Sequence, residues 1–407
     1  MHCFDVIIVG GGASGFFSAI QLAQQVPDIR IAILERGKEV LSKVKISGGG
    51  RCNVTHACFI PNILTKFYPR GERELRGPFH TFCTGDIMEW FEHRGVALKI
   101  EEDGRVFPES NSSQTIIDCF LKEADTAGVK IVKQTVVQHV VKRNGNKWLL
   151  ETSNGDFECT QLIMATGSNP KIWELVSVLG HTIVPPVPSL FTFNVKDDRI
   201  QDLMGVSAPM VTMKVKNTSL KANGPLLITH WGMSGPAVLR LSAWGARELF
   251  DLNYKFSIGI NWLNEQTFDE VLEELMVFKQ ELARKNIVKK APFELTNRLW
   301  EKLVLASGIS EDAKWADIGK KQLVKLAEQL TQATFEVNGK STFKDEFVTA
   351  GGVDLKEVNF KTMESKPNDN LYFTGEILNI DAITGGFNFQ NAWTTGFLAA
   401  QAIAAKY

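Results

Sequence analysis

The chain has 407 residues, with 45 Lys and Arg against 46 Asp and Glu, so its net charge at neutral pH is −1. Its length predicts roughly two or three compact modules, and 44% hydrophobic with 22% charged residues excludes a mainly disordered or fibrous chain. Because a protein that grips phosphate backbones usually has a basic surplus, the balanced charge predicts that nucleic acid is not a partner.

No apolar run approaches the ~18 residues that span a bilayer, and the N-terminus has no basic flank or cleavage-type site. We therefore expect a cytoplasmic monomer or homodimer without a membrane partner. All six cysteines lie before residue 160 without a repeated spacing, which predicts free thiols and no metal site. A redox disulfide between Cys52 and Cys58 is the alternative.

The first segment of the chain predicts a dinucleotide site. Phe4–Val9 is a continuous apolar run, typical of a strand buried on both faces, and it leads directly into a G-x-G-x-x-G motif. Helical spacing follows, and a second strand, Ile29–Leu34, ends in Glu35. This order of elements is the fingerprint of a Rossmann unit that binds a dinucleotide. The motif consists of Gly10, Gly11, Gly12, Ala13, Ser14 and Gly15.

Each part of this motif has a physical role. Gly10 permits the sharp turn out of the strand, Gly12 lets backbone approach a pyrophosphate, and Gly15 lets the helix pack closely on the sheet. The helix N-terminus offers unpaired N–H groups to the phosphates. Glu35 would accept hydrogen bonds from ribose hydroxyls and repel a 2′-phosphate, which argues against NADP here. Arg36 follows directly and is a further expected contact.

The next region departs from the pattern of an NAD dehydrogenase. Strand-like runs follow from Thr135, separated by the hairpin signals Asn144-Gly145 and Asn154-Gly155, and they close on Ala165-Thr166-Gly167. A β-meander inserted at this place resembles FAD enzymes of the glutathione-reductase class. That resemblance implies cofactor contacts at the closing strand end and at Val136.

Near the C-terminus, Leu371–Glu376 predicts a strand that runs into a turn, and Gly385-Gly386-Phe387-Asn388 precedes an apolar helix over Gln390–Ala405. FAD enzymes of the same class usually close with a strand, an acid and a helix whose N-terminus faces the flavin pyrimidine and stabilises negative charge there. The alternative for the helix is simple core packing. After Gly375, both Glu376 and Asp381 are candidates for the acid at the ribityl chain, and the choice stays open. The expected contacts at the helix start are Gly386, Phe387 and Asn388.

Four ordered motifs carry a family resemblance. They are Lys43–Thr55, Thr229–Ser242, Thr349–Val353 and Thr374–Trp393. Together they resemble the BaiN-type (also called YhiN-type) bacterial flavoproteins, which are FAD- or NAD(P)/FAD-dependent oxidoreductases. The resemblance runs from residue 4 to the C-terminus. Bile-acid-type enone reduction and amine oxidation have both been attached to relatives.

The resemblance implies an α/β fold, in which a glutathione-reductase-class Rossmann FAD domain with a β-meander carries an inserted α+β domain of β-barrel and helices. We expect the FAD domain at residues 1–190 and 346–407, and the inserted substrate-side domain at 191–345 with a helical part at about 265–331. Inside the insertion, helical patterns cover Phe268–Arg284, Pro292–Ala306 and Lys320–Thr331, and Asn338-Gly339 with Thr342 onward suggests a hairpin that leads back.

The segment Gly48–Asn53 combines three glycines with a cation, a thiol and an amide. Its glycines allow backbone to lie against a flat ring, so we expect it beside the isoalloxazine and pyrophosphate. The alternative is a conformationally demanding loop beneath a helix. The expected cofactor contacts of this region are Lys43, Ser47, Gly49, Gly50, Arg51, Cys52 and Asn53.

His230, within T-H-W-G-M-S-G-P, is the candidate proton donor or substrate-orienting residue, because a histidine near neutral pKa supplies the proton that complements hydride delivery from flavin N5. A structural histidine in a Gly-Pro turn is the alternative, and Arg51 is a second catalytic candidate. No second G-x-G-x-x-G stands in a strand–helix context, so NAD(P)H, as a transient electron donor, would bind without its own Rossmann domain.

These observations predict an FAD-dependent oxidoreductase that exchanges hydride between flavin N5 and a small organic substrate. The favoured reaction is reduction of a conjugated carbonyl-type acceptor with NAD(P)H. One alternative is a flavin oxidase that passes electrons from an amine or similar substrate to O₂. A further alternative is a non-catalytic flavin sensor or a tRNA-associated flavoprotein.

Overall fold

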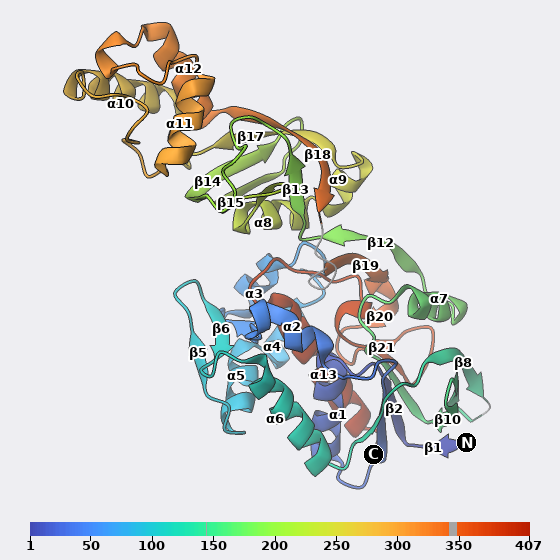
Figure 1. The fold of residues 1–407 in the computed structure, drawn as a ribbon. Coiled ribbons are helices and arrows are strands. Elements are labelled where there is room, and N and C mark those ends of the chain that lie inside the picture. The colour runs from blue at the N-terminus through green and yellow to red at the C-terminus, as the bar shows by residue number, and fades with distance from the viewer. Residues whose placement is uncertain (144, 342–347) are drawn as a thin grey trace. The chain divides into compact units, whose positions relative to one another are not determined.

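The computed structural model describes residues 1–143, 145–341 and 348–407, and the chain divides into two compact units (Figure 1). The first unit comprises Met1–Val187 and Lys344–Tyr407, and the second comprises Pro188–Phe343. Each unit is considered by itself. The expected boundary after residue 345 and the expected turn residue Asn144 lie outside the described residues.

The main sheet of the first unit has seven strands in the order β20-β21-β22-β11-β2-β3-β7. Neighbours from β22 to β7 are parallel, and the residues of β22, β11, β2 and β3 are buried, whereas the edge strand β7 is partly exposed. Parallel strands place their carboxyl ends at one edge of a sheet, and that edge receives the motifs singled out above. The strands are β20 (Val358–Asn359), β21 (Glu364–Ser365), β22 (Leu371–Phe373), β11 (Gln161–Met164), β2 (Val6–Val9), β3 (Ile31–Leu34) and β7 (Lys130–Val132).

Helices α1 and α13 pack against each other on this sheet (Figure 1). Trp393 of α13 contacts the rings of Phe17, Phe91 and Phe120 in an aromatic core. Helix α13 begins three residues before the predicted Gln390, because Gly386 takes φ +91° and the helix starts directly after it. The helices of this unit are α1 (Ala13–Gln25), α2 (Ser42–Gly50), α3 (Pro61–Leu64), α4 (Arg76–Thr81), α5 (Thr84–Glu92), α6 (Ser113–Thr126), α7 (Pro170–Val178) and α13 (Phe387–Ala404).

Three smaller sheets complete the first unit. The predicted meander is confirmed: β8, β9 and β10 are antiparallel neighbours, and β1 extends them in the order β1-β10-β9-β8. A second sheet has the order β4-β6-β5, and β12 pairs with β19. The strands are β1 (His2–Cys3), β8 (Val137–Arg143), β9 (Lys147–Thr152), β10 (Gly155–Cys159), β4 (Thr55–His56), β5 (Leu98–Ile100), β6 (Arg105–Pro108), β12 (Ile183–Ser189) and β19 (Val348–Val353).

The second unit is a closed six-stranded barrel with helices, as predicted. Its strands follow the order β13-β16-β15-β14-β17-β18, and alternate residues point into one apolar core that continues into the helices. The strands are β13 (Thr192–Val195), β14 (Ser207–Val215), β15 (Lys221–Thr229), β16 (Gly232–Ser234), β17 (Lys255–Asn261) and β18 (Ala333–Ser341). The helices are α8 (Pro236–Trp244), α9 (Ala246–Asp251), α10 (Phe268–Glu281), α11 (Asn297–Ala306) and α12 (Lys320–Thr331).

Two predictions for the second unit need correction. The prediction of a hairpin at Asn338-Gly339 is wrong, because β18 continues through this pair. The register between β18 and β13 shifts there instead. Gly339 takes φ +102° and its N–H donates to the Tyr254 carbonyl, so the turn signal marks a bulge. The helix expected from Pro292 starts at Asn297, where Thr296 caps its first turn. Thr342 lies outside the described residues.

Candidate functional site

The glycine motif forms the turn from β2 into α1. A Cβ on Gly10, which takes φ +114°, would lie 2.4 Å from the Ala165 carbonyl oxygen, and one on Gly15 would lie 2.1 Å from the Gly10 oxygen. Both positions therefore require glycine for packing. At Gly12, no atom of the described residues comes within 4 Å of the Cβ position. The backbone before α1 thus opens onto free space beside the helix N-terminus, where an anionic group is stabilised.

Glu35, at the end of β3, is joined to this turn. One carboxylate oxygen accepts from the Gly11 N–H at 2.8 Å, and the other accepts from the Gly37 N–H at 2.7 Å. Each oxygen keeps a further lone pair for a ligand hydroxyl. The Glu35 carbonyl also accepts from the Thr135 N–H, which places the half-exposed Val136 next to it. The Arg36 side chain is exposed.

The carboxyl ends of β11 and β22 continue the same edge. Lys43 of α2 donates to Glu376 Oε2 at 2.6 Å, and that oxygen lies 3.6 Å from the Cβ position of Gly167. A Cβ on Gly375 would lie 2.8 Å from Ser14 Oγ, so this connection touches the start of α1. Three buried oxygens here have no hydrogen-bond partner among the described residues: Thr166 Oγ1, Thr374 Oγ1 and Glu376 Oε1. Buried polar atoms need partners, so this edge is built to receive a polar ligand.

The two candidate acids differ in their surroundings. Asp381 is fully buried and forms a two-pronged ion pair with the Arg70 guanidinium. Glu376 is partly exposed and keeps the unpartnered Oε1. The geometry therefore favours Glu376 as the acid that meets a ligand, and assigns Asp381 to holding the chain before α13.

The start of α13 lies against the segment that follows the glycine run. A Cβ on Gly386 would lie 2.5 Å from the Thr55 carbonyl, and Thr55 Oγ1 donates to Gln390 Oε1 at 2.6 Å. The Asn388 amide is used internally, because it accepts from the Ala382 N–H at 3.0 Å and donates to the Ala382 carbonyl at 3.3 Å. What this helix start offers a ligand is therefore its first-turn N–H groups. Phe387 is buried.

The segment Gly48–Asn53 follows a kink in α2 at Ser47–Gly49. Gly48, Gly49 and Gly50 take φ of 57°, 68° and 84°, and Cys52 also lies in the left-handed region at 60°. Gly49 and Gly50 are exposed, and no described atom lies within 4 Å of their Cβ positions. This stretch therefore offers bare backbone over an open space. The Ser47 hydroxyl donates to the Val44 carbonyl at 2.8 Å.

Side chains of this segment are held mainly by other residues of the first unit. Arg51 pairs with Glu101 at 2.6 Å and stacks on Phe107 at 3.9 Å, and Asn53 Oδ1 accepts from the Val106 N–H at 3.3 Å. Burial raises the pKa of the Cys52 thiol to about 12, so it is a neutral thiol at neutral pH. All six cysteines are free thiols in this structure. The catalytic role of Arg51 stays a prediction.

His56 lies in this region as well, although the sequence did not predict it as a site residue. Its ring stacks on Phe387 at 4.6 Å, Nε2 lies 3.1 Å from the Asp103 carbonyl, and Nδ1 is buried without a partner among the described residues. Burial lowers the pKa of His56, so the ring is neutral near pH 7. Its place directly after the glycine-rich segment was the available signal.

His230 belongs to the second unit, on the exposed turn between β15 and β16. It lines a hollow of about 1200 Å³, together with Thr229, residues of the loop from Val195 to Met204, and Gln329 of α12. Arg199 inside this hollow is held by Asp197 at 2.6 Å and Gln329 at 2.8 Å. His230 is thus an accessible side chain beside a cavity large enough for an organic ligand.

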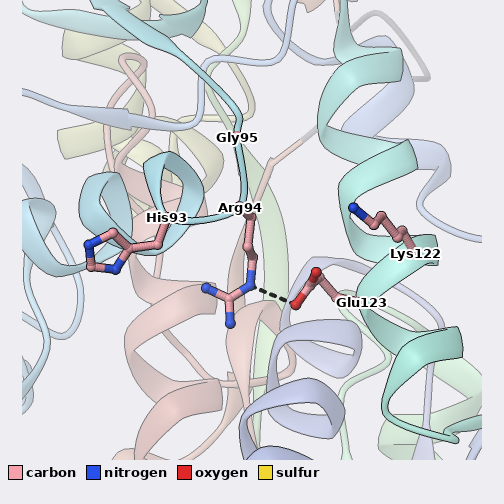
Figure 2. A pocket seen from close by; sticks show the side chains of 5 residues that line it. All are labelled: His93, Arg94, Gly95, Lys122 and Glu123. Atoms are coloured by element: carbon pink, nitrogen blue, oxygen red, sulfur yellow. Dashed lines mark hydrogen bonds and ion pairs between the residues drawn. The ribbon is translucent and has the colours of Figure 1, made fainter.

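A hollow of about 620 Å³ on the first unit has a different character. It is lined by His93, Arg94, Gly95, Lys122 and Glu123 (Figure 2). Arg94 pairs with Glu123 at 2.9 Å and stacks on Trp90 at 3.9 Å. Two of its charged residues, Arg94 and Glu123, neutralise each other, and none of its lining residues comes from the carboxyl edge of the sheet. Among the described residues there is also no group of three side chains suited to a metal, and no helix long and apolar enough to cross a membrane.

A parallel sheet with a glycine turn, an acid at the next strand end, a meander and a closing helix defines the dinucleotide-binding class to which flavoenzymes belong. A family model described as "HI0933-like protein Rossmann domain" matches residues 4–402, and the chain belongs to this family. It is therefore an FAD-dependent oxidoreductase, and the family and fold predicted from the motifs are confirmed.

Similar proteins include a ribosomal RNA dihydrouridine synthase of Haemophilus influenzae, 29% identical over 412 residues, which covers 98% of each chain. A 3-dehydro-bile acid delta(4,6)-reductase of Clostridium scindens is 26% identical over 409 residues, again with 98% of each chain. Among solved structures, a 3-ketosteroid delta1-dehydrogenase from Sterolibacterium denitrificans superimposes over 100% of both chains with a TM-score of 0.52 at 10% identity. This last likeness shows the fold alone.

Proposed function

We propose that the protein uses FAD to reduce a carbon–carbon double bond conjugated to a carbonyl, with NAD(P)H as the electron donor. The observation that carries the FAD site is the carboxyl edge of the main sheet. There, open backbone at Gly12, the Glu35 carboxylate, the start of α13 and three buried oxygens that have no partner among the described residues follow one another. These residues fit a long ligand with phosphates, hydroxyls and a flat ring.

Each group along this edge has a separate role in binding FAD. The N–H groups at the start of α1 hold the pyrophosphate, and Glu35 accepts from the adenosine ribose. Glu376 accepts a ribityl hydroxyl on Oε1, and Lys43 compensates its charge. The start of α13 stabilises negative charge on the pyrimidine side, and Gly49-Gly50 lets the ring approach backbone. When bound, FAD supplies hydride transfer at N5.

The names of the similar proteins point to one acceptor class. Dihydrouridine differs from uridine by reduction of the C5–C6 double bond, which is conjugated to the C4 carbonyl. A delta(4,6)-reductase of a 3-dehydro bile acid likewise acts on double bonds conjugated to a ketone. When a double bond α,β to a carbonyl is reduced in this way, hydride adds to the β carbon and a proton adds to the α carbon. We assign delivery of that proton to His230.

We favour a uracil base in ribosomal RNA as the acceptor, by the likeness to the dihydrouridine synthase over the full chain. The expectation against nucleic acid rested on whole-chain charge, which does not describe how charge is distributed. A small conjugated ketone of the bile-acid type is the second candidate, supported by the likeness to the reductase. A cytoplasmic monomer or homodimer, with the second unit on the substrate side, stays our prediction.

The test uses the FAD-loaded protein without oxygen. NADH or NADPH is expected to bleach the flavin, and unmodified ribosomal RNA is expected to restore its colour while uridine gains two hydrogens, measured by mass spectrometry of nucleosides. Restoration by a 3-oxo-Δ4,6 steroid but not by RNA would favour the second candidate. Restoration by O₂ alone, after bleaching by an amine, would instead identify an oxidase, and no bleaching by any donor would identify a sensor.

A substitution at His230 tests whether this residue delivers the proton. His230→Gln is expected to leave the flavin spectrum and the bleaching by NAD(P)H unchanged, because His230 lies outside the first unit. Recolouring by the acceptor should slow by roughly 10²–10⁴-fold, the usual contribution of a positioned acid. An unchanged rate would remove His230 from the proposal without affecting the assignment of FAD.

A further inference from the structure

Positive charge is concentrated in one part of the second unit. Residues 282–325 contain ten Lys and Arg but five Asp and Glu, whereas the whole chain has a net charge of −1. This stretch runs from the end of α10 through α11 to the first half of α12 (Figure 1). A local basic excess inside a balanced chain is the pattern expected of a module that meets a polyanion.

Backbone contacts bring the basic residues to one place. The loop after α10 carries Arg284, Lys285, Lys289 and Lys290, and an isolated bridge pairs its Asn286 with Lys314. The Trp315 N–H donates to the Lys285 carbonyl at 3.1 Å, and the Ala316 N–H donates to the Ala283 carbonyl at 3.0 Å. We call these five cations, Arg284, Lys285, Lys289, Lys290 and Lys314, the basic surface.

The loop that carries the basic surface is held in a fixed shape. Asn286 Oδ1 accepts from the Val288 N–H at 2.8 Å and from the Lys289 N–H at 3.2 Å, and its Nδ2 donates to the Glu311 carbonyl at 2.8 Å. The side chains of Ile287 and Val288 are buried in the apolar core of the unit. A loop anchored on both sides presents its lysines without the ordering entropy of a flexible tail.

The five cations are exposed, and none forms an ion pair within the part of the chain that the structure describes. Other cations of the same unit do have partners, such as Arg199 with Asp197 and Lys221 with Glu265. Three carboxylates, Glu311, Asp312 and Asp317, share the neighbourhood, so the excess is reduced but not removed.

The start of α12 adds positive charge to this region, although cations at this position do not stabilise the helix. Its first turn contains Lys320 and Lys321 and no acidic residue, although a helix N-terminus favours negative side chains. Helix α10 in the same unit follows the favourable pattern, with Asp269 and Glu270 in its first turn. Lys320 and Lys321 therefore add positive charge to this region without stabilising the helix dipole.

We propose that the basic surface, together with the first turn of α12, binds the phosphate backbone of the RNA that carries the acceptor uracil. This inference rests on the proposed function for the identity of the RNA, but its physical basis is charge complementarity on the second unit alone. Lys and Arg side chains displace counterions from phosphates, so the contact would be strong at low salt and independent of base sequence.

The test is a charge reversal with a matched control. The triple variant Lys285→Glu, Lys289→Glu, Lys290→Glu is compared with Lys214→Glu, Lys216→Glu, Lys255→Glu, three exposed lysines on the barrel of the same unit. Binding of the full-length, FAD-loaded proteins to a fluorescent ribosomal RNA fragment is measured by anisotropy across a series of KCl concentrations.

The first variant is expected to weaken binding roughly tenfold to hundredfold at about 0.1 M salt, and to lower the slope of log K against log salt by about 2–3, at about 0.7–0.9 per lost phosphate contact. The control variant should bind like the original protein. Both should keep the flavin spectrum and the bleaching by NAD(P)H, which shows that they fold.

The outcomes separate this inference from the proposed function. Equal binding by both variants, with uridine still reduced, would overturn the basic surface while the function stands. Loss of binding in the first variant, in a protein that reduces no uridine, would keep the surface and overturn the acceptor. Binding to vesicles containing phosphatidylserine but not to RNA would overturn the inference in favour of a membrane.

Discussion

The two units use their cations in different ways. Along the candidate cofactor edge and around it, Lys43 pairs with Glu376, Arg51 with Glu101, and Arg70 with Asp381. On the basic surface of the second unit, five cations face solvent without an ion pair among the described residues. Around the candidate cofactor edge charge fixes the shape of a site, whereas on the basic surface it is directed to solvent. The difference teaches that whole-chain charge describes neither region.

Breaking the most buried of these pairs should have the largest effect on stability. Asp381→Asn removes the carboxylate charge from the pair with Arg70, whose side chain is 15% exposed. Removal of one partner of a buried pair costs about 3–5 kcal/mol, so we expect a loss of that size in the free energy of unfolding, measured by urea titration.

The matched variant is Glu376→Gln, whose partner Lys43 is 55% exposed. Because exposed pairs contribute only about 0–1 kcal/mol, stability should barely change while FAD is held more weakly. Equal losses of stability in the two variants would contradict the distinction between the two acids.

Two glycines of the turn between β2 and α1 have different roles, since Gly15 is needed for packing and Gly12 is proposed to be needed for binding FAD. Gly15→Ala places a Cβ 2.1 Å from the Gly10 oxygen, and overpacking of this kind costs about 1–3 kcal/mol. Gly12→Ala meets no described atom within 4 Å, so the apoprotein should melt normally but lose affinity for FAD. Thermal unfolding of both apoproteins, followed by FAD titration, checks the pair. A strongly destabilised Gly12→Ala protein would show that its open side is not a ligand site.

Glu35 serves both the fold and the proposed ligand, because its carboxylate also accepts from the Gly11 and Gly37 N–H groups. Glu35→Ala removes the acceptor proposed for the ribose, and a hydrogen bond to a charged group is worth about 1.5–3 kcal/mol. FAD affinity should therefore fall by roughly 10- to 100-fold in a fluorescence titration, while Glu35→Gln, which keeps one oxygen for the Gly11 N–H, should lose less. An unchanged affinity would mean that the ribose lies elsewhere.

The smallest expected effect concerns pH. His181 is buried with Nδ1 3.0 Å from Glu357 and Nε2 3.0 Å from Ser365, and burial lowers its pKa from the usual 6.5 despite the neighbouring carboxylate. The folded protein therefore favours the neutral ring, and the unfolded chain binds the extra proton first. Stability is fully present above pH 6.5 and is lost as pH falls below that value.

The measurement is the urea midpoint at pH 7.5, 6.5 and 5.5, chosen around the usual pKa of 6.5, for the original protein and for His181→Gln. The variant should show a flatter profile in this range. The pKa of Glu357 is lowered from 4.5, where burial, which would raise it, is outweighed by hydrogen bonds from Thr182 and His181. Its contribution is lost only at more acidic pH, so it does not obscure the result. Parallel profiles for both proteins would contradict the assignment.

The sequence was sufficient for what depends on local backbone geometry. The strand–glycine–helix order, the acid at Glu35 and the meander were all predictable, because each depends on residues close in the chain. The class of the second unit followed from the family resemblance. The start of α13 was misplaced by three residues, because the left-handed Gly386 decides it.

Properties that depend on distant partners were beyond prediction. Our proposal of Glu376 rather than Asp381 depends on the pairing of Asp381 with Arg70, more than 300 positions earlier in the chain. The Asn338-Gly339 pair carries the usual signal for a hairpin, yet pairing of β18 with β13 and β17 turns it into a bulge. The basic surface was hidden because acidic residues elsewhere cancel its charge in the total.

Half of the proposed cofactor edge comes from the last part of the chain, since β22 and α13 follow the second unit in sequence yet complete the sheet and cover α1. During synthesis, one side of β11 therefore stays unpaired until β22 (Leu371–Phe373) has been made. The proposed edge can therefore hold FAD only after α13 has been synthesised and packed against α1.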